Sequence, residues 1–466
     1  MSMWVAYCHL CSAVGFILAL KGLASPTSAR KGNVFGILGM VLAIVTSFFV
    51  PGMQHLPYLM LLIAIGGGIG TMLAFKIRMT AVPQLVAGFH SFVGLAAVLV
   101  AFCAFLTPEA FSIGHAGQIL VANLIEMSLG LLIGALTFSG SLVAFLKLQG
   151  LITGQPLRFK GQHLFNIVLA LLILLCLMVF IKYQRVEVML AMAVGAALLG
   201  VLLIMPIGGA DMPVVISMLN SYSGWSAAGI GFTLGNELLV ITGALVGASG
   251  AILSYVMCKA MNRSIFNVIF GGYQSLGFAE SIHTQHLGDI QQANGADAAF
   301  LMSQAKNIIV VPGYGMAVAH AQHALKELTQ DLITLGARVR FAIHPVAGRM
   351  PGHMNVLLAE ANISYDLVFE QSEINREFLS CDVVLVVGAN DITNPAAKNN
   401  PQSPIFGMPI LDVGLAKTVF FIKRSMAPGY AGVDNDLFYQ ANTYMIFGDA
   451  KFVLESICKN LETLKA

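Results

Sequence analysis

The polarity of the chain changes near residue 262, and this change limits the fold more than any other feature. Before it lie nine apolar stretches, each near the ~20 residues that a helix needs to cross a bilayer. After about residue 300 the sequence has the mixed polarity of a water-soluble fold. The whole chain is 57% hydrophobic with a mean hydropathy of +0.80, which is too apolar for a soluble protein. We therefore predict a membrane helical bundle over residues 1–262, a linker over 263–300 and a soluble domain over 301–466.

The charges between the apolar stretches predict the orientation of the bundle. Ten Lys and Arg residues fall in one set of connections and only Lys182 and Arg185 in the other. Because cytoplasmic loops carry the excess of Lys and Arg, we expect the N-terminus outside and the soluble domain inside the cell. The first apolar stretch has neither a basic leader nor a cleavage signal, so we expect it to be retained as a helix. The nine predicted helices run roughly over residues 4–24, 33–50, 57–75, 83–106, 120–146, 163–181, 187–205, 212–233 and 238–260.

Charge and cysteine usage exclude some functions. Residues 1–263 carry 12 Lys and Arg against 5 Asp and Glu, whereas residues 264–466 carry 13 against 18. The soluble part is thus mildly acidic and has no basic stripe, which argues against a nucleic-acid partner. The seven cysteines include a single pair with CxxC spacing, Cys8 and Cys11, inside an apolar stretch. Packing of small residues explains this pair better than metal or redox chemistry, and we predict no metal site.

Polar residues inside the apolar stretches mark a candidate ion path. His90 and Asn220 would each lie ~10–12 Å from the cytoplasmic end of their helices at ~1.5 Å per residue, so the two could share a hydrogen bond. Buried ionisable groups are costly in lipid, and histidine titrates near neutral pH, so we predict a proton carrier at His90, with a purely structural role as the alternative. The serines and glycines of the same stretch, and Gly243-x-x-x-Gly247 in the next one, are better explained by close helix packing.

Two carboxylates could extend this path. Glu126 would lie nearer the outer face and could receive protons there, although an ordinary interfacial carboxylate explains it equally well. Asp211 precedes the eighth stretch. It could cap that helix or face the soluble domain.

The soluble part alternates short apolar β-type runs with helical stretches such as residues 318–335 and 452–464. Alternating βα units predict an α/β, doubly wound parallel sheet of the Rossmann-like type, which binds ligands outside the carboxyl ends of its strands. The six predicted strands cover residues 307–311, 338–343, 366–369, 383–387, 419–422 and 443–447.

Glycines and polar residues follow these predicted strands. Gly313-Tyr314-Gly315 comes after the first, and its spacing to Val318 departs from G-x-G-x-x-G in the third position. Glycines at a strand end let backbone N–H groups approach a pyrophosphate. No acidic residue closes the second strand, where an NAD site would bind the ribose 2′-hydroxyl, whereas Lys423, Arg424 and Ser425 suit a 2′-phosphate. The sequence therefore favours NADP(H), with an exposed basic strand end as the alternative.

Several long blocks resemble one family. The residues from His90 to Leu99, Gly208 to Val215, Met218 to Trp225 and Pro312 to Ala319 are similar to beta subunits of proton-translocating NAD(P) transhydrogenases. So are residues 344–361, 388–397 and 423–432. The resemblance covers nearly the whole chain. It implies nine transmembrane helices, a C-terminal NADP(H)-binding domain, a proton path through His90 and Asn220, and Asp211 near the boundary between membrane and domain.

The resemblance also implies a set of cofactor-binding residues at the strand ends. Besides Gly313 and Gly315, this set contains Tyr314, Val346, Ala347, Gly348, Arg349, Met350, Pro351, Gly388, Ala389, Asn390, Asp391, Ile392, Gly407, Met408, Lys423, Arg424, Ser425, Met426, Ala427, Pro428, Gly429, Tyr430, Asp449 and Ala450.

Transhydrogenation needs two nicotinamides, and the sequence contains one dinucleotide-type fold. The resemblance implies that an alpha subunit supplies the NAD(H) site, that hydride passes directly between the two rings, and that αβ units pair in a bacterial inner membrane. It also implies NADPH formation driven by inward proton flow. In that reaction no side chain need act as acid or base. The alternative is an ion channel or secondary transporter with a regulatory nucleotide-binding domain.

Overall fold

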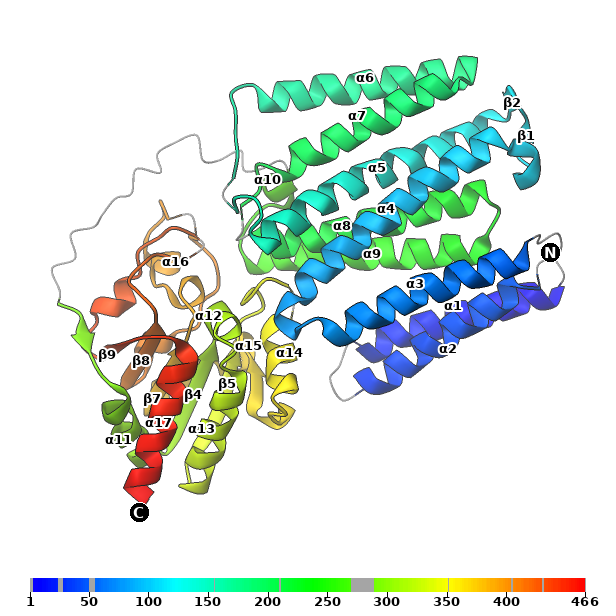
Figure 1. Cartoon of the computed structure of the whole chain (residues 1–466). Coiled ribbons are helices and arrows are strands. Elements are labelled where there is room, and N and C mark those ends of the chain that lie inside the picture. The colour runs from blue at the N-terminus through cyan, green and yellow to red at the C-terminus, as the bar shows by residue number, and fades with distance from the viewer. Residues whose placement is uncertain are drawn as a thin grey trace. The chain divides into compact units, whose positions relative to one another are not determined.

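The computed structural model describes residues 3–23, 28–49, 55–154, 156–208, 211–269, 289–350, 352–403, 405–429 and 431–465. The chain divides into two compact units, and Figure 1 shows both. The first consists of Met1–Ile207 and Val215–Leu253, and the second of Gly208–Val214 and Ser254–Ala466. This division does not test where the membrane ends, so the boundary at residue 262 stays a prediction.

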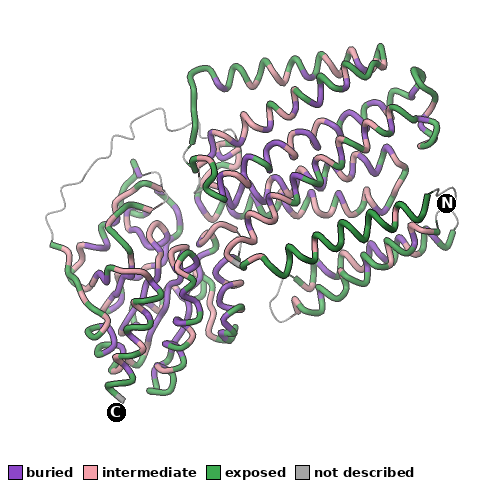
Figure 2. The backbone as a smooth tube through the Cα atoms, viewed as in Figure 1, coloured by how far each residue is buried: buried purple, intermediate pink, exposed green. Residues whose placement is uncertain are grey.

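Long helices dominate the first unit, close to the predicted bounds. Their apolar side chains are widely exposed, as on Phe75, Phe92 and Met178, and Figure 2 shows exposed residues along most of them. Such surfaces belong in lipid, because a water-soluble protein rarely exposes large apolar patches. The helices are α1 (Met3–Leu23), α2 (Ala29–Ser47), α3 (Leu56–Lys76), α4 (Val82–Leu106), α5 (Val121–Gln149), α6 (Gln162–Tyr183), α7 (Val186–Ile204), α8 (Met212–Thr233) and α9 (Glu237–Ala260).

Eight of these helices are long and apolar enough to span a membrane, among the residues that the structure describes. α8 is the exception, since serines, an asparagine and glycines interrupt its apolar sequence. A short hairpin of β1 (Gly114–His115) and β2 (Gln118–Ile119) joins α4 to α5.

The second unit contains a seven-stranded sheet in which every neighbouring pair is parallel. The strand order is β3-β9-β8-β7-β4-β5-β6. Without β3, the six strands β4 to β9 have the order of a doubly wound Rossmann-like sheet, which confirms the predicted fold class. The strands are β3 (Gln291–Gln292), β4 (Asn307–Pro312), β5 (Arg338–Ile343), β6 (Val368–Glu370), β7 (Val383–Val387), β8 (Thr418–Lys423) and β9 (Thr443–Phe447).

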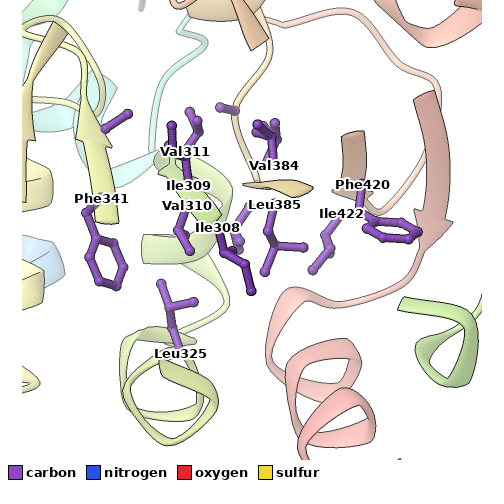
Figure 3. Packing of buried hydrophobic residues seen from close by; sticks show 14 of the residues in the cluster. Ile308, Ile309, Val310, Val311, Leu325, Phe341, Val384, Leu385, Phe420 and Ile422 are labelled. Carbon is purple, nitrogen blue, oxygen red and sulfur yellow. The ribbon is translucent and has the colours of Figure 1, made fainter. Parts of the chain in front are cut away.

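Helices cover the sheet, and α17 packs against both α11 and α13. Figure 3 shows Leu325 of α13 on the side of β4 from which Ile308 and Val310 extend, in a core that includes Phe341 and Phe420. β4 and β7 are buried at almost every position, as expected for central strands covered on both faces. The helices are α10 (Ile265–Ile269), α11 (Gly295–Gln304), α12 (Tyr314–Val318), α13 (Gln322–Thr334), α14 (His353–Glu360), α15 (Gln371–Ile374), α16 (Ala396–Asn399) and α17 (Ala450–Lys465). The 3-10 helices are η1 (Met79–Ala81), η2 (Pro108–Phe111), η4 (Tyr365–Leu367), η5 (Asn375–Ser380), η6 (Asp391–Thr393), η7 (Val413–Leu415) and η8 (Asp436–Tyr439).

The structure differs from the predicted elements in two places. The helix expected over residues 318–335 is broken, because His320 has a left-handed φ of 52° between α12 and α13. Part of the expected linker belongs to the sheet domain, since β3 pairs with β9 and α11 starts at Gly295. Asn294 caps α11 and accepts hydrogen bonds from the Ala296 and Asp297 N–H groups at 2.8 and 2.9 Å. The sequence of the expected linker shows no hydrophobic periodicity. A strand of two residues such as β3 is too short to produce one, so the sequence could not predict it.

Candidate functional sites

The loops that follow β4 and β7 meet where the strand order reverses. The Gly313 N–H donates to the Val387 carbonyl at 2.9 Å, and the Gly315 N–H donates to the Gly388 carbonyl at 2.8 Å. After β4 the chain continues to β5 on one side of this strand pair, and after β7 it continues to β8 on the other side. This switch point is where open α/β sheets bind their ligands.

Glycines are required for this contact. A Cβ on Gly313 would lie 2.5 Å from the Ala389 Cα, and a Cβ on Gly388 would lie 2.4 Å from the Gly315 Cα. Gly388 also has a φ of +65°, which residues with a Cβ rarely adopt. Backbone therefore faces backbone at this strand edge. Ala389, just before η6, and Ile392, within η6, are both buried and contribute to the packing of this loop.

His344 holds the loop after β5 in place. Its Nδ1 accepts from the Val346 N–H at 3.3 Å, which leaves Nε2 as the donor to the Pro409 carbonyl at 2.7 Å. Burial lowers the pKa of His344 to about 4, so the ring is neutral at physiological pH. The bond joins the loop that contains Ala347 and Met350 to the segment that contains Gly407 and Met408. Met408 is buried in a cluster that includes Ile405 and Ile410 and packs against Val346.

Tyr314, Arg349 and His353 form a second cluster at the same edge. The Arg349 guanidinium lies 4.5 Å from the centre of the Tyr314 ring, a cation–π distance. The Arg349 N–H donates to His353 Nδ1 at 3.0 Å, and a Cβ on Gly348, whose φ is +109°, would touch the His353 ring. Burial, and then the charge of Arg349, lowers the pKa of His353 to about 4. Pro351, another predicted site residue, lies outside the described residues.

The sequence analysis missed His353 as a site residue. Its Nε2 is buried and has no hydrogen-bond partner in the described part of the chain. His353 lies eight residues after Pro345 in the sequence, and this spacing by itself gives only a weak indication of a site residue. His344 directly follows β5 and could have been chosen on that basis.

The loop after β7 also receives the chain that follows β8. The Ala431 N–H donates to Asp391 Oδ2 at 3.0 Å, and Asn435 Nδ2 donates to Asn390 Oδ1 at 3.1 Å. A Cβ on Gly429 would lie 2.4 Å from Asp391 Oδ1, so this part of the chain passes close to the Asp391 carboxylate. Tyr430 falls outside the described residues, between two positions that contact Asp391.

The predicted basic residues at the end of β8 have internal partners. Lys423 Nζ donates to the Ala427 carbonyl at 2.9 Å and lies 4.6 Å from the centre of the Phe438 ring. Burial lowers the Lys423 pKa, while Asp391 and Asp434 oppose that shift. Arg424 Nη2 donates to Asp449 Oδ2 at 2.5 Å, with the arginine side chain 61% exposed. Ser425 Oγ accepts from the Ala427 N–H at 3.4 Å.

These contacts place the described candidates for the cofactor site along one edge of the sheet. Met426 packs against the main core, and Pro428 continues the segment towards Gly429. Asp449 Oδ1 accepts from the Lys451 N–H at 3.1 Å, at the start of α17, where Ala450 is buried. Burial raises the Asp449 pKa, but Arg424 and the Lys451 N–H lower it by more, so the carboxylate is charged at neutral pH.

In the first unit, His90 and Asn220 meet as the sequence predicted. His90 Nε2 and Asn220 Oδ1 are 3.1 Å apart, one on α4 and the other on α8. Because a carboxamide oxygen only accepts, this geometry makes Nε2 the donor and leaves Nδ1 of a neutral ring able to accept a proton. Nδ1 is buried and has no hydrogen-bond partner among the described residues. His90 is therefore a buried, titratable residue whose Nδ1 is available to bind a proton.

The serines and glycines around this pair pack helices, as expected. Ser221 Oγ donates to the Gly247 carbonyl at 2.6 Å, and Ser217 Oγ donates to the Gly250 carbonyl at 3.0 Å. A Cβ on Gly224 would lie 2.4 Å from the Gly247 N. α8 and α9 thus approach each other along their backbones.

The other predicted residues are less defined. Glu126 is partly buried in the second turn of α5, and its proton role stays a prediction. Asp211, in the second unit, accepts two hydrogen bonds from Arg263 Nη1 at 2.8 and 2.9 Å. Cys8 and Cys11 are free and lie in α1. Across the described ranges no His, Cys, Asp and Glu group could hold a metal ion.

Apolar helices with a buried histidine–amide pair, followed by a doubly wound parallel sheet with glycine-lined strand ends, define a membrane protein with a dinucleotide-type domain. The family model of the NAD(P) transhydrogenase beta subunit matches residues 5–460, and the chain belongs to that family. The chain is 60% identical over 451 residues to "NAD(P) transhydrogenase subunit beta" of Rhodospirillum rubrum, which covers 96% of this chain and 97% of the relative. The protein of that name from a designated strain of the same species has the same values.

Proposed function

We propose that this chain is the membrane subunit of a proton-pumping transhydrogenase and that it binds NADP(H) at the carboxyl edge of its sheet. The proposal rests on family membership and on the backbone contact between Gly313 and Gly388. That contact supports nucleotide binding because it holds the two glycine loops together at the switch point, where open α/β sheets bind their ligands and backbone N–H groups can approach a pyrophosphate. An ion channel with a regulatory domain finds no support in the family match.

The residues present fit NADP(H). Lys423 and Arg424 would bind the 2′-phosphate, because two cations and the Ser425 hydroxyl stand at the end of β8. The bound nicotinamide would supply hydride transfer. Arg349, which lies over Tyr314, and the buried His353 Nε2 would offer further donors to the cofactor.

This chain would orient the cofactor and exclude water from it. The hydrogen bonds of Ala431 and Asn435 to Asp391 and Asn390 support a cover formed by residues 428–432, since they attach the chain that follows β8 to the loop after β7. The neutral His344 would keep the β5 loop fixed to Pro409 during the reaction.

Proton transfer would occur at His90. A proton would bind at Nδ1 while Nε2 keeps its bond to Asn220, and the resulting charge would alter how α4 and α8 pack. Protonation would then bias the NADP(H) affinity of the domain, and bound nucleotide would shift the proton affinity by the same factor. Glu126 and Asp211 would lie on this path.

The remaining parts of the proposal concern the assembly. An alpha subunit would supply the NAD(H) site, and two αβ units would form the enzyme in a bacterial inner membrane. The N-terminus would be periplasmic and the sheet domain cytoplasmic, and inward proton flow would drive NADPH formation.

The test is nucleotide binding to the chain co-purified with its alpha subunit. Calorimetric titration should give far tighter binding of NADP(H) to this chain than of NAD(H). Lys423→Ala with Arg424→Ala should remove most of that preference, by about 1.5–3 kcal/mol for each lost charged hydrogen bond. The matched control is Lys451→Ala, which removes a lysine that is paired with Glu455 on α17. Equal affinity of the unmutated chain for both nucleotides would contradict the proposal.

A further inference from the structure

A buried lysine at the end of α5 has no part in the functions described so far. Lys147 is only 5% exposed, although a charged side chain at a helix end ordinarily extends into water. Lys147 is one of the ten Lys and Arg residues that predict the orientation, and it lies in the last turn of α5.

The Lys147 ammonium group is fully occupied by carbonyl oxygens from the end of α7. Nζ donates to the Met205 carbonyl at 2.6 Å, to the Ile207 carbonyl at 2.8 Å and to the Ile204 carbonyl at 3.3 Å. These three acceptors match the three hydrogens of an ammonium group. The last carbonyls of a helix lack intrahelical partners and carry partial negative charge, so a cation is well placed there.

Other groups hold the same helix end. Gln162 Nε2 donates to the Leu202 carbonyl at 3.0 Å, and the Leu157 N–H donates to the Met205 carbonyl at 3.2 Å. The end of α7 is therefore attached to α5 by Lys147 and to the α5–α6 connection and α6 by Leu157 and Gln162. Of these groups in the described chain, Lys147 alone reaches as far as Ile207.

Ile207 is the residue at which the chain leaves the first unit. The next segment, Gly208–Val214, belongs to the second unit and contains Asp211, which is paired with Arg263. The chain then re-enters the first unit as the body of α8, which carries Asn220. Along the chain, Asp211 is followed directly by α8 and is preceded by the end of α7 that Lys147 holds.

We propose that Lys147 is a positioning residue for energy coupling, because it fixes the α7 side of this junction so that displacements of Asp211 pass into α8. The inference rests on the proposed function, since it is α8 that presents Asn220 to His90. Without Lys147 the end of α7 would yield, and nucleotide events would reach the His90–Asn220 pair less completely.

The test uses the complete enzyme with its alpha subunit, reconstituted in vesicles, and measures protons pumped per hydride transferred. Lys147→Met should lower this ratio by about fivefold or more, within the range of ordinary coupling energies. NADP(H) affinity should stay near the wild-type value. Lys147→Arg should restore most of the ratio, because guanidinium also donates several hydrogen bonds from a fixed charge.

Two controls separate coupling from general damage. Lys160→Met removes an exposed lysine from the α5–α6 connection, and Gln162→Leu loosens α7 without freeing Ile207. Both should keep the wild-type ratio. If Lys147→Met does not assemble, Lys147→Gln replaces it and should lower the ratio by a smaller factor.

The outcomes also separate this inference from the proposed function. A wild-type complex that transfers hydride without pumping protons would overturn the proposed function. A wild-type complex that pumps, together with a Lys147→Met or Lys147→Gln complex that pumps with the same ratio, would overturn the role of Lys147 alone. A loss of coupling in Gln162→Leu equal to that in Lys147→Met would also overturn it.

Discussion

Arg424 and Asp449 form an ion pair at the carboxyl ends of the neighbouring strands β8 and β9, with 2.5 Å between Nη2 and Oδ2. Both residues belong to the proposed NADP(H) site. Because the arginine side chain is 61% exposed, water screens the pair and it contributes little to stability. A phosphate dianion could therefore replace Asp449 as the partner of Arg424 with only a small loss of free energy from the broken pair.

The first prediction concerns this competition. Asp449→Asn removes the competing charge and should raise the preference for NADP(H) over NAD(H) by about threefold, since an exposed pair is worth ~0.5–1 kcal/mol. Competitive nucleotide titrations measure the ratio. Asp382→Asn, which removes an acid paired with Lys417 at the other end of the strands, is the control and should leave it unchanged. A reduced preference in Asp449→Asn would show that the carboxylate itself binds the cofactor.

The second prediction concerns proton transfer. His90→Ala should abolish most proton pumping and the transhydrogenation coupled to it, because the bundle loses the titratable partner of Asn220. Binding of NADP(H) should persist. Pumping is measured with a pH-sensitive dye in vesicles, and His115→Ala, which removes an exposed histidine of the hairpin between α4 and α5, should pump normally. Normal pumping by His90→Ala would return that residue to a packing role.

The third prediction concerns acid stability of the sheet domain. His344 and His353 have pKa values of about 4 in the fold against about 6.5 in an unfolded chain, so the unfolded chain binds more protons between these values. Stability is complete above pH 6.5 and falls as the pH drops towards 4. From pH 7 to pH 5 we expect each histidine to cost about 2 kcal/mol of unfolding free energy.

Denaturant titration of residues 289–466 at both pH values measures this loss. The segment starts at residue 289 because β3 pairs with β9. His353→Asn keeps an acceptor for the Arg349 N–H and should roughly halve the pH dependence. His323→Asn, which changes a more exposed histidine of α13, should leave it unaltered. Equal stability at pH 7 and pH 5 in the unmutated domain would contradict the burial of the two rings.

The fourth prediction concerns release of the cofactor. Tyr430 lies outside the described residues, but Gly429 and Ala431 on either side of it contact Asp391. If residues 428–432 cover NADP(H), Tyr430→Ala should speed release of the nucleotide and leave hydride transfer between already bound nucleotides nearly intact. Stopped-flow release and single-turnover transfer measure the two steps. Tyr365→Ala, an exposed tyrosine before β6, serves as the control. A slow transfer step with unchanged release would exclude a covering role.

Much of the fold follows from local pattern. The six predicted strands are present, with β5, β7 and β9 at the predicted bounds, because most of them are short apolar runs and the central ones are buried on both faces of a parallel sheet. The two departures have local causes that hydrophobic periodicity does not record. His320 adopts a left-handed backbone, and β3 consists of two exposed glutamines, Gln291 and Gln292.

The candidate sites were predictable to different degrees. The His90–Asn220 contact followed from depth alone, because both residues are counted from the same end of straight helices. The Arg424–Asp449 pair, the bonds of His344 and the three carbonyls around Lys147 join segments that are distant in sequence. Such pairs depend on how loops fold back on the sheet or on how helices end, and no spacing rule anticipates them.

The polar contacts of α8 bear on how the protein is made. α8 is not apolar enough to be counted among the eight candidate spans of the described chain, and Ser217 and Ser221 find their acceptors on α9. Alone in lipid these hydroxyls would lack their interhelical partners, and the Asn220 amide would be exposed to hydrocarbon. Only residues 234–236 separate the two helices. We therefore expect α8 to wait at the translocation channel during synthesis until α9 has emerged, and the two helices to enter the bilayer together as a hairpin.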